Sequence, residues 1–312
     1  MREILFVLLS FLIFPGFLFT AVVGLLAGWV DRKVTARIQW RVGPPWYQNF
    51  VDFFKLMGKE TILPSGAQKI SFLLSPLIGL IGITLTSFIL WEMNLYPVRS
   101  FIGDLIVILC LSIFPSLALI IGGSASGNLF ASLGVSRETK LMLAYELPFV
   151  IAVFTPIVAI RDIRIGSVLT YQMNNGMMFT HHLSSFIALI VAFFCMQAKL
   201  AFVPFDIPEA EQEIMGGPLI EYSGPPLAMF KLTKAMMLFA LPVLLITVFG
   251  GGMRFDGIQA LFSIVKYLII LILIILVKNT NPRLRIDQAL RFFWLRMFPL
   301  AIVGFIMALI GI

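Results

Sequence analysis

Five carboxylates lie close together in residues 204–226, a segment between two long apolar runs that we call the acidic loop. They are Asp206, Glu209, Glu211, Glu213 and Glu221. The run Asp206-Ile207-Pro208-Glu209 is typical of a helix start, and Gly216-Gly217-Pro218 is typical of a helix end. In such a helix Glu209 and Glu213 share a face, and their repulsion raises the pKa of at least one carboxyl group. Carboxyl groups with raised and coupled pKa values exchange protons near neutral pH. The sequence therefore favours proton transfer here over the alternative, a solvated acidic loop balanced by nearby Lys and Arg.

Two further ionisable residues lie at membrane depth within apolar runs. Glu146, which follows Tyr145, lies in one run, and Lys266 lies near the middle of another. A charge at that depth costs about 2.5–3.5 kcal/mol, so by default it faces a polar cavity and has a function. For Lys266, snorkelling or one structural ion pair is an equally good interpretation. For Glu146 that alternative is weaker, because other charged residues lie in the same half of its run.

The sequence contains no residue set with metal-ligand spacing. Cys110 and Cys195 lie inside apolar runs without a CxxC spacing or a nearby His, which is typical of small buried hydrophobic side chains. His181 and His182 have no third ligand and are expected on a loop surface. The glycine-rich stretch 122–127 lacks the strand-to-helix context of a phosphate loop and is expected to be a flexible connection. We therefore expect no metal and no iron–sulfur cluster in this chain.

The composition requires membrane helices to position these residues. Of the 312 residues, 60% are hydrophobic and only 12% are charged, whereas soluble globular proteins have about 25% charged residues. The mean hydropathy is +1.00. A soluble globule is excluded, and so is a disordered chain, because disorder requires low hydrophobicity. The apolar runs are continuous and not alternating, which excludes a β-barrel.

We predict an all-α, polytopic membrane protein of about eight transmembrane helices, because a bilayer core needs about 20 apolar residues per helix. The predicted spans are residues 4–30, 70–91, 101–121, 139–160, 183–203, 227–249, 258–277 and 292–312. No repeat or linker divides the chain, so residues 1–312 are predicted to form a single integral membrane domain. Seventeen of the 23 Lys and Arg residues lie in or beside the odd-numbered loops, and five lie on the other side. This bias predicts that both termini are outside and that the long loops are in the cytoplasm, with the protein in the cell membrane.

An amphipathic helix is predicted in the first of these cytoplasmic loops, over residues 47–60. The residues on its apolar face are Tyr47, Phe50, Val51, Phe54 and Met57. The periodicity alone indicates an anchor that lies in the plane of the membrane interface. The basic stretch 36–45 before it indicates contact with lipid headgroups or a docking surface.

Four sequence blocks contain most of these residues and resemble one family. The blocks are 36–44 (ARIQWRVGP) with 55–60 (KLMGKE), 134–146 (GVSRETKLMLAYE), 204–224 (PFDIPEAEQEIMGGPLIEYSG) and 282–288 (PRLRIDQ). Over almost its whole length the chain resembles the H subunit (subunit 1) of respiratory complex I, the NADH–quinone oxidoreductase. It also resembles the homologous membrane subunit of energy-converting nickel–iron hydrogenases. The block in the acidic loop is the most specific of the four.

The resemblance implies eight spans and a cytoplasmic face that docks a soluble electron-transfer arm. It also implies that the acidic loop and the glutamate of the fourth span belong to a polar path between redox chemistry and ion pumping. The expected residues of this path are Tyr145, Glu146, Asp206, Glu209, Glu211, Glu213 and Glu221, with Lys266 added for its membrane depth alone. The expected docking residues are Arg37, Gln39, Arg41, Lys55, Lys59, Glu60, Arg137, Arg283, Arg285 and Asp287.

Three departures from the quinone-type pattern favour the hydrogenase branch. Pro45 stands where Asn is typical, Leu141 stands near a common Gln, and Phe202-Val203 precedes Pro204 where Arg is frequent. These substitutions remove polar groups that a quinone channel would use. The runs SRE at 136–138 and MGGPLIE at 215–221 are similar to the hydrogenase branch.

The resemblance therefore implies a non-redox subunit of a ferredoxin-dependent, membrane-bound nickel–iron hydrogenase, which anchors the soluble arm and links redox energy to proton or sodium translocation. The nickel–iron centre and the iron–sulfur clusters are expected on partner chains, the hydrogenase large and small subunits, beside antiporter-like membrane subunits. The alternatives are the quinone-site subunit of a complex I-type oxidoreductase and a subunit of a related sulfur-reducing complex. A stand-alone secondary transporter would show internal repeats, which the sequence lacks. No nucleic-acid partner is expected.

Overall fold

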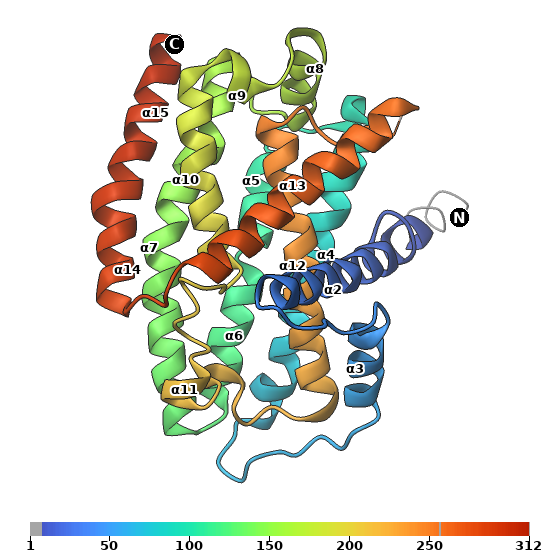
Figure 1. Ribbon diagram of the computed structural model, residues 1–312, viewed down its shortest axis with the longest axis vertical. Helices are drawn as coiled ribbons and strands as arrows, with labels where there is room; N and C mark the ends of the chain where they lie inside the picture. Colours follow the sequence, from blue (N-terminus) through green and yellow to red (C-terminus); the bar gives the residue numbers. More distant parts are fainter. Residues whose placement is uncertain (1–7, 256, 312) are drawn as a thin grey trace.

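The computed structural model describes residues 8–255 and 257–311, except for the side chain of Glu211, and these residues form a bundle of tilted helices without strands (Figure 1). The long helices are α2 (Phe17–Ile38), α4 (Lys69–Leu95), α7 (Leu129–Ile160), α10 (Leu183–Lys199), α12 (Gly224–Phe249) and α13 (Ile258–Thr280). The shorter helices are α3 (Gln48–Met57), η1 (Pro97–Arg99), α5 (Asp104–Leu111), α6 (Phe114–Ala125), α8 (Ile165–Asn175), α9 (Met178–His181), α11 (Glu211–Ile214), η2 (Gly217–Leu219), α14 (Ile286–Phe292), the π-helical η3 (Phe293–Met297) and α15 (Phe298–Ile310).

The prediction of an all-α polytopic membrane protein is confirmed. Seven apolar helical segments of the described residues are long enough to cross a bilayer, and α10, with 17 residues, is a shorter apolar helix. Two of the seven are interrupted: residues 13–16 bend the first segment before α2, and the segment Asp104–Ala125 consists of α5 and α6. The predicted order of apolar helices along the chain is therefore correct.

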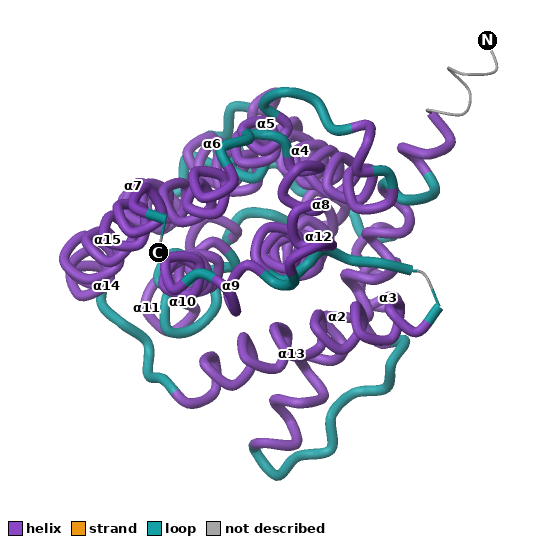
Figure 2. Tube along the Cα trace, turned by 90° about the horizontal axis from the view of Figure 1, so that it is seen from above, coloured by secondary structure: helices purple, strands orange, loops and turns teal. Residues whose placement is uncertain are grey.

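Helix α12 is the central element of the bundle, and α2, α4, α10 and α13 pack against it (Figure 2). Residues of α12 are apolar on all sides, which is typical of a helix that is buried all round. Of its most apolar window 89% is buried, whereas only 28% is buried in the segments that contain α2, α13 and α15. The three outer segments therefore leave much of their apolar surface open to lipid or to partner subunits. On the other side of α12, helices α7, α10 and α15 pack together (Figure 1).

The connection between the third and fourth spans differs from the prediction. Helix α7 begins at Leu129, ten residues before the predicted start, because the side chain of Asn128 accepts a hydrogen bond from the Phe130 N–H and caps the helix. The expected flexible stretch 122–127 is also wrong in part, since α6 continues to Ala125. Gly122 is there for close packing, because a Cβ at this position would collide with Tyr222 Oη and Ser75 Oγ. Three residues, 126–128, connect the two helices.

The predicted amphipathic helix is α3, which packs against α2 and α12. Asn49 is buried on its inner side and donates a hydrogen bond from Nδ2 to the Leu25 carbonyl over 2.8 Å. Val51 and Phe54 of the predicted apolar face are exposed, with 48% and 69% of their surface accessible. An exposed apolar face on a helix beside the spans is what an interfacial anchor requires.

The two cysteines differ from each other. Cys195 is buried, as predicted, but Cys110 is exposed on α5. An apolar helix that faces lipid exposes small hydrophobic side chains as readily as it buries them, so periodicity could not separate the two positions.

Candidate functional site

The acidic loop does not form the helix that its sequence predicted. Only one helical turn, α11, is present, and it begins at Glu211 after a non-helical Ala210. The chain then turns back through the left-handed residues Met215 and Gly216. Gly217 passes so close to the Pro208 carbonyl that a Cβ would collide with it. The predicted stacking of carboxylates on one helix face is therefore wrong.

Instead, three carboxylates of the loop each form an ion pair with a different part of the chain. Asp206 pairs with Arg283, before α14, over 2.7 Å. Glu209 pairs with Lys234 of α12 over 2.5 Å. Glu213 pairs with Arg137 of α7 over 2.6 Å. The three pairs hold the loop against α7, α12 and the segment between α13 and α14.

The carboxylates of the loop lie in different electrostatic environments. Burial raises the pKa of Asp206, against the opposing effects of Lys234 and Arg283, and its Oδ1 has no hydrogen-bond partner in the described part of the chain. The hydrogen bond from Arg137 lowers the pKa of Glu213, which is largely exposed. Glu221, at the end of the loop, accepts a hydrogen bond from Asn128 Nδ2 over 2.6 Å. The loop thus contains one carboxyl group whose pKa is raised by burial and one whose pKa is lowered by a hydrogen bond.

Glu146, the predicted glutamate at membrane depth, pairs with Lys199. The Lys199 Nζ lies 3.0 Å and 3.1 Å from the two carboxylate oxygens and joins α10 to α7. The Lys199 side chain has no accessible surface, and its ammonium group also lies 5.0 Å from the centre of the Phe149 ring. Tyr145, beside Glu146, is buried, and its hydroxyl lies 3.1 Å from Ser116 Oγ.

A cavity of about 460 Å³ is lined by Glu209 of the acidic loop and by Lys199, the partner of Glu146. It lies among α2, α3, α6, α7, α12 and the first residues after α10. Its ionisable wall residues are Asp31, Arg32, Asp52, Glu138, Lys199, Glu209, Lys231 and Lys234. Asn49 also lines it, and the Asn49 Oδ1 is buried without a hydrogen-bond partner among the described residues. The cavity thus brings Glu209 of the acidic loop and Lys199, the partner of Glu146, to one space whose wall is mainly apolar.

Glu138 is one of the residues of this cavity that sequence reasoning missed. Only 4% of its surface is accessible, and in the described structure it forms no ion pair within 4.0 Å. Ser116 forms a hydrogen bond with its carboxyl group, and Lys234 and Glu209 are its charged neighbours. Because α7 starts earlier than predicted, Glu138 lies within the helix and not in a loop.

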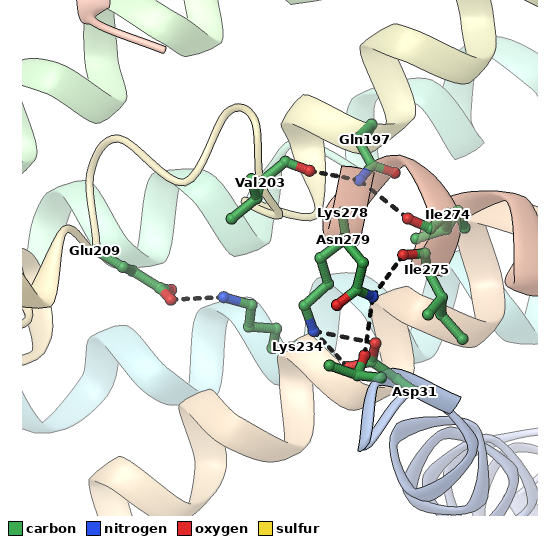
Figure 3. Close-up of polar contacts among 10 residues, drawn as sticks. Asp31, Gln197, Val203, Glu209, Lys234, Ile274, Ile275, Lys278 and Asn279 are labelled. Atoms are coloured by element: carbon green, nitrogen blue, oxygen red, sulfur yellow. Dashed lines mark hydrogen bonds and ion pairs between the residues drawn. The ribbon is translucent and has the colours of Figure 1, made fainter. Parts of the chain in front are cut away.

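Four charged residues that form ion pairs in this region were also missed as site residues, although each lies at or near the end of an apolar run. They are Asp31, Lys199, Lys234 and Lys278. Lys278 Nζ of α13 lies 2.7 Å from Asp31 Oδ2 of α2. Figure 3 shows this ion pair together with the Glu209–Lys234 pair. The adjacent Asn279 donates hydrogen bonds to Ile275 O and to the α2 residue Thr35 (Figure 3).

The predicted docking residues are mostly exposed. Arg37, Gln39, Arg41, Lys55, Lys59, Glu60, Arg285 and Asp287 have accessible side chains. Arg137 and Arg283 are half-buried because they pair with the acidic loop. One hollow of mixed charge has a volume of about 700 Å³, and its charged wall residues are Arg283, Arg285, Asp206, Glu209 and Glu213. The segment after α3 reaches the end of the acidic loop, since the Ile62 N–H donates a hydrogen bond to Ser223 Oγ over 3.0 Å.

Lys266 does not join the acidic loop. Its Nζ donates a hydrogen bond to the Gly250 carbonyl over 2.7 Å, at the end of α12. The acidic loop lies at the start of α12, and a helix of 26 residues is about 39 Å long. Lys266 therefore satisfies a carbonyl group at the opposite end of the bundle. No group of three or more His, Cys, Asp or Glu side chains that could hold a metal ion occurs in residues 8–255 and 257–311.

The sequence and the structure are similar to those of known membrane subunits of respiratory complexes. The family model described as NADH dehydrogenase matches residues 9–309. NADH-quinone oxidoreductase subunit 8 of Thermus thermophilus is 30% identical over 308 residues, which cover 91% of this chain and 83% of the relative. The H subunit of the NADH-quinone oxidoreductase of a Geobacillus species is 32% identical over 300 residues, 92% of this chain and 88% of the relative. A chain of the membrane-bound sulfane sulfur reductase, an archaeal respiratory membrane complex, matches with a TM-score of 0.83 and 30% identity, covering 94% of this chain and 96% of that chain.

Proposed function

The chain belongs to the NADH dehydrogenase family as a homologue of the H subunit of NADH-quinone oxidoreductase, and we propose that it is the anchor and coupling subunit of a ferredoxin-driven membrane complex of the hydrogenase type. It is a multi-pass subunit of a multi-subunit membrane respiratory complex. In the proposed complex, electrons pass to a catalytic centre on a partner chain, and this chain performs no redox step. It binds the soluble arm through the mixed-charge hollow at the acidic loop, on the cytoplasmic side, and relays the released energy to ion-translocating membrane subunits.

The observation that carries this proposal is the set of ion pairs between the acidic loop and the membrane helices. A soluble partner that docks on the hollow changes the field at Asp206 and Glu213. Because Glu209 pairs with Lys234 inside the bundle, a change of charge in the loop also changes the balance of charge around the cavity. The loop can therefore convert an event at the docking surface into a protonation change at membrane depth.

The free energy needed to move one ion across the membrane is comparable to that of a moderate pKa change in one carboxyl group. Moving one elementary charge against 100 mV requires about 2.3 kcal/mol. One pKa unit corresponds to about 1.36 kcal/mol, so a change of about 1.7 in the pKa of one carboxyl group is equivalent to that work. Asp206 and Glu213 already differ in this way, because burial raises the pKa of Asp206 and the hydrogen bond from Arg137 lowers the pKa of Glu213.

The test is ion translocation by the purified complex in liposomes, driven by reduced ferredoxin. We expect Glu213→Gln, and Glu146→Gln combined with Lys199→Met so that no buried charge is left unpaired, to keep electron transfer and to lose most ion translocation. The matched control is Glu92→Gln, a carboxylate that pairs with Arg99 near the end of α4 and is expected to leave translocation unchanged. Wild-type translocation in both variants, with the complex intact, would overturn the coupling role.

The acceptor on the partner chain is tested separately. Hydrogen evolution with about one nickel per complex supports the nickel–iron hydrogenase. Sulfide production without nickel assigns the chain to a sulfur-reducing complex, in which its anchor and coupling role is the same, and the structural similarity to the sulfane sulfur reductase favours this second candidate.

A quinone-reducing complex is a further candidate, because the relatives are NADH-quinone oxidoreductase subunits and the cavity of about 460 Å³ could hold an apolar molecule with a polar head. Quinone that co-purifies with the complex and is reduced by it would support that candidate and overturn the hydrogenase assignment.

A further inference from the structure

Phe202, two residues before the acidic loop, lies between two lysines that belong to different ion pairs. Its ring centre is 4.6 Å from Lys278 Nζ and 5.5 Å from Lys234 Nζ, and both distances are within the range of a cation–π interaction. Lys278 is paired with Asp31, and Lys234 is paired with Glu209. One aromatic ring is thus shared by two ammonium groups with separate counterions.

The two ion pairs join parts of the chain that are otherwise far apart in sequence. Asp31 and Lys278 connect α2 to α13, and Glu209 and Lys234 connect the acidic loop to α12. Figure 3 shows the two pairs side by side, with the residues after α10 running past them. Among the described residues no ion pair joins one of these pairs to the other, and the Phe202 ring lies within cation–π distance of a lysine from each.

A change of charge in one pair must affect the other through this ring. If a change in the acidic loop weakens the Glu209–Lys234 pair, the ring and the other nearby acids become the main stabilising contacts of Lys234. A stronger cation–π interaction of the ring with Lys234 weakens its interaction with Lys278, because both ammonium groups use the same π electrons and repel each other. Lys278 then depends more on Asp31, which shifts α13 toward α2.

Helices α2 and α13 are suited to such a shift. The segments that contain them bury only 28% of their apolar windows, whereas α12 buries 89%. A displacement of α2 and α13 therefore breaks fewer packed contacts within the chain than a displacement of α12.

We propose that Phe202 is a positioning residue that couples the Glu209–Lys234 pair to the Asp31–Lys278 pair and so transmits protonation of the acidic loop to α2 and α13. This inference rests on the proposed coupling function and names the first step of the relay from the loop into the membrane helices. An aliphatic side chain of similar size fills the same space but provides no π face for the two ammonium groups.

The test compares Phe202→Leu, Phe202→Tyr and Phe202→Trp in the purified complex, with ions translocated per electron as the measurement. We expect Phe202→Leu to lower this ratio by about fivefold, the factor that corresponds to about 1 kcal/mol of cation–π energy. Tyr and Trp keep the π face and should restore the ratio. The control is Phe194→Leu on α10, whose ring contacts the rings of Phe193 and Phe292.

A double-mutant cycle in the wild-type background supplies a measurement that does not depend on the stability of the Phe202 variants. In the wild-type background, the effect of the double variant Glu209→Gln/Asp31→Asn on the ratio should differ about fivefold from the product of the two single effects, because the two pairs are coupled. In the Phe202→Leu background the two effects should simply multiply.

A normal ratio in Phe202→Leu, a ratio in Phe202→Tyr as low as in Phe202→Leu, or multiplicative effects in the wild-type background would each overturn the inference. These outcomes differ from a failure of the proposed function, which would appear as a wild-type complex that transfers electrons without translocating ions.

Discussion

Lys199 and Glu146 form an ion pair in which the lysine side chain is completely buried and the carboxylate is 17% exposed. Because the pair joins α10 to α7 inside the bundle, each residue depends on the other for its charge to be tolerated. Removing one partner of a buried pair typically destabilises a protein by about 3–5 kcal/mol.

We therefore expect Lys199→Met to lower the stability of the purified protein by about 3 kcal/mol, the lower end of that range, because Glu146 retains some exposure. The double variant Lys199→Met/Glu146→Gln removes both charges and should recover most of the loss. Thermal unfolding in detergent at fixed pH measures the three variants. A double variant as unstable as Lys199→Met alone would show that lost packing of the lysine stem, and not the unpaired carboxylate, causes the effect.

The Glu213–Arg137 pair should stabilise the acidic loop in a pH-dependent way. The hydrogen bond from Arg137 lowers the pKa of Glu213 below its ordinary value of 4.5 in the folded chain. A lowered pKa in the folded state gives stability that is fully present above the ordinary pKa and is lost as the pH falls through the folded value.

The exposed pair is worth about 0–1 kcal/mol, so its effect is measured locally, as protection of the loop amides from hydrogen exchange. At pH 7 the loop should exchange faster in Glu213→Gln than in the wild type. The difference should shrink progressively below about pH 4.5 as Glu213 is protonated. A difference that is the same at pH 3.5 and at pH 7 would exclude the ion pair as its cause.

Gly122 allows α6 to approach Tyr222 and Ser75, whose hydroxyl groups lie 2.9 Å apart. An added methyl group would collide with both oxygens, and forcing a methyl group into a packed core costs about 1–3 kcal/mol. We expect Gly122→Ala to lower the unfolding temperature clearly, whereas Gly66→Ala, at a position with open space around it, should not. Equal stability of the two variants would mean that α6 relaxes away from Tyr222 without loss.

The order of helices could be predicted from sequence because the length of an apolar run and its periodicity are local properties. The run 227–249 and the amphipathic pattern of 47–60 correspond to α12 and α3 for that reason. The start of α7 could not be placed correctly, because the N-cap at Asn128 outweighed the polar residues that follow it.

The arrangement of the site depended on information that is not local. The acidic loop was identified by its five carboxylates, but its three cations lie in α7, in α12 and before α14, and nothing in the spacing indicates which cation pairs with which carboxylate. Those long-range pairs replaced the predicted helix 206–216. Glu138 was overlooked for a related reason, since its burial follows from how α7 packs near α6 and the cavity and not from its neighbours in sequence.

Glu138 should be required for coupled translocation although no sequence motif singled it out. Its carboxyl group is buried in the wall of the cavity, its charged neighbours are Glu209 and Lys234, and it is hydrogen-bonded to Ser116, whose Oγ lies 3.1 Å from the Tyr145 hydroxyl. It therefore lies between the acidic loop and the residue next to Glu146. Gln has nearly the same shape and can accept the bond from Ser116, but it cannot exchange a proton.

We expect Glu138→Gln to keep the stability and the electron transfer of the complex and to lower ion translocation at least tenfold. Loss of a proton-transferring side chain typically lowers a rate by a factor of about 10²–10⁴. The control is Asp162→Asn, a carboxylate outside the cavity, after α7, that is held by Ser167 and Arg164. Translocation by reduced ferredoxin in liposomes, measured beside thermal unfolding, separates the two effects. If Glu138→Gln translocates ions as the wild type does, protons or ions reach Glu146 by another route, and the wall of the cavity formed by Lys199 and Lys234 becomes the next place to search.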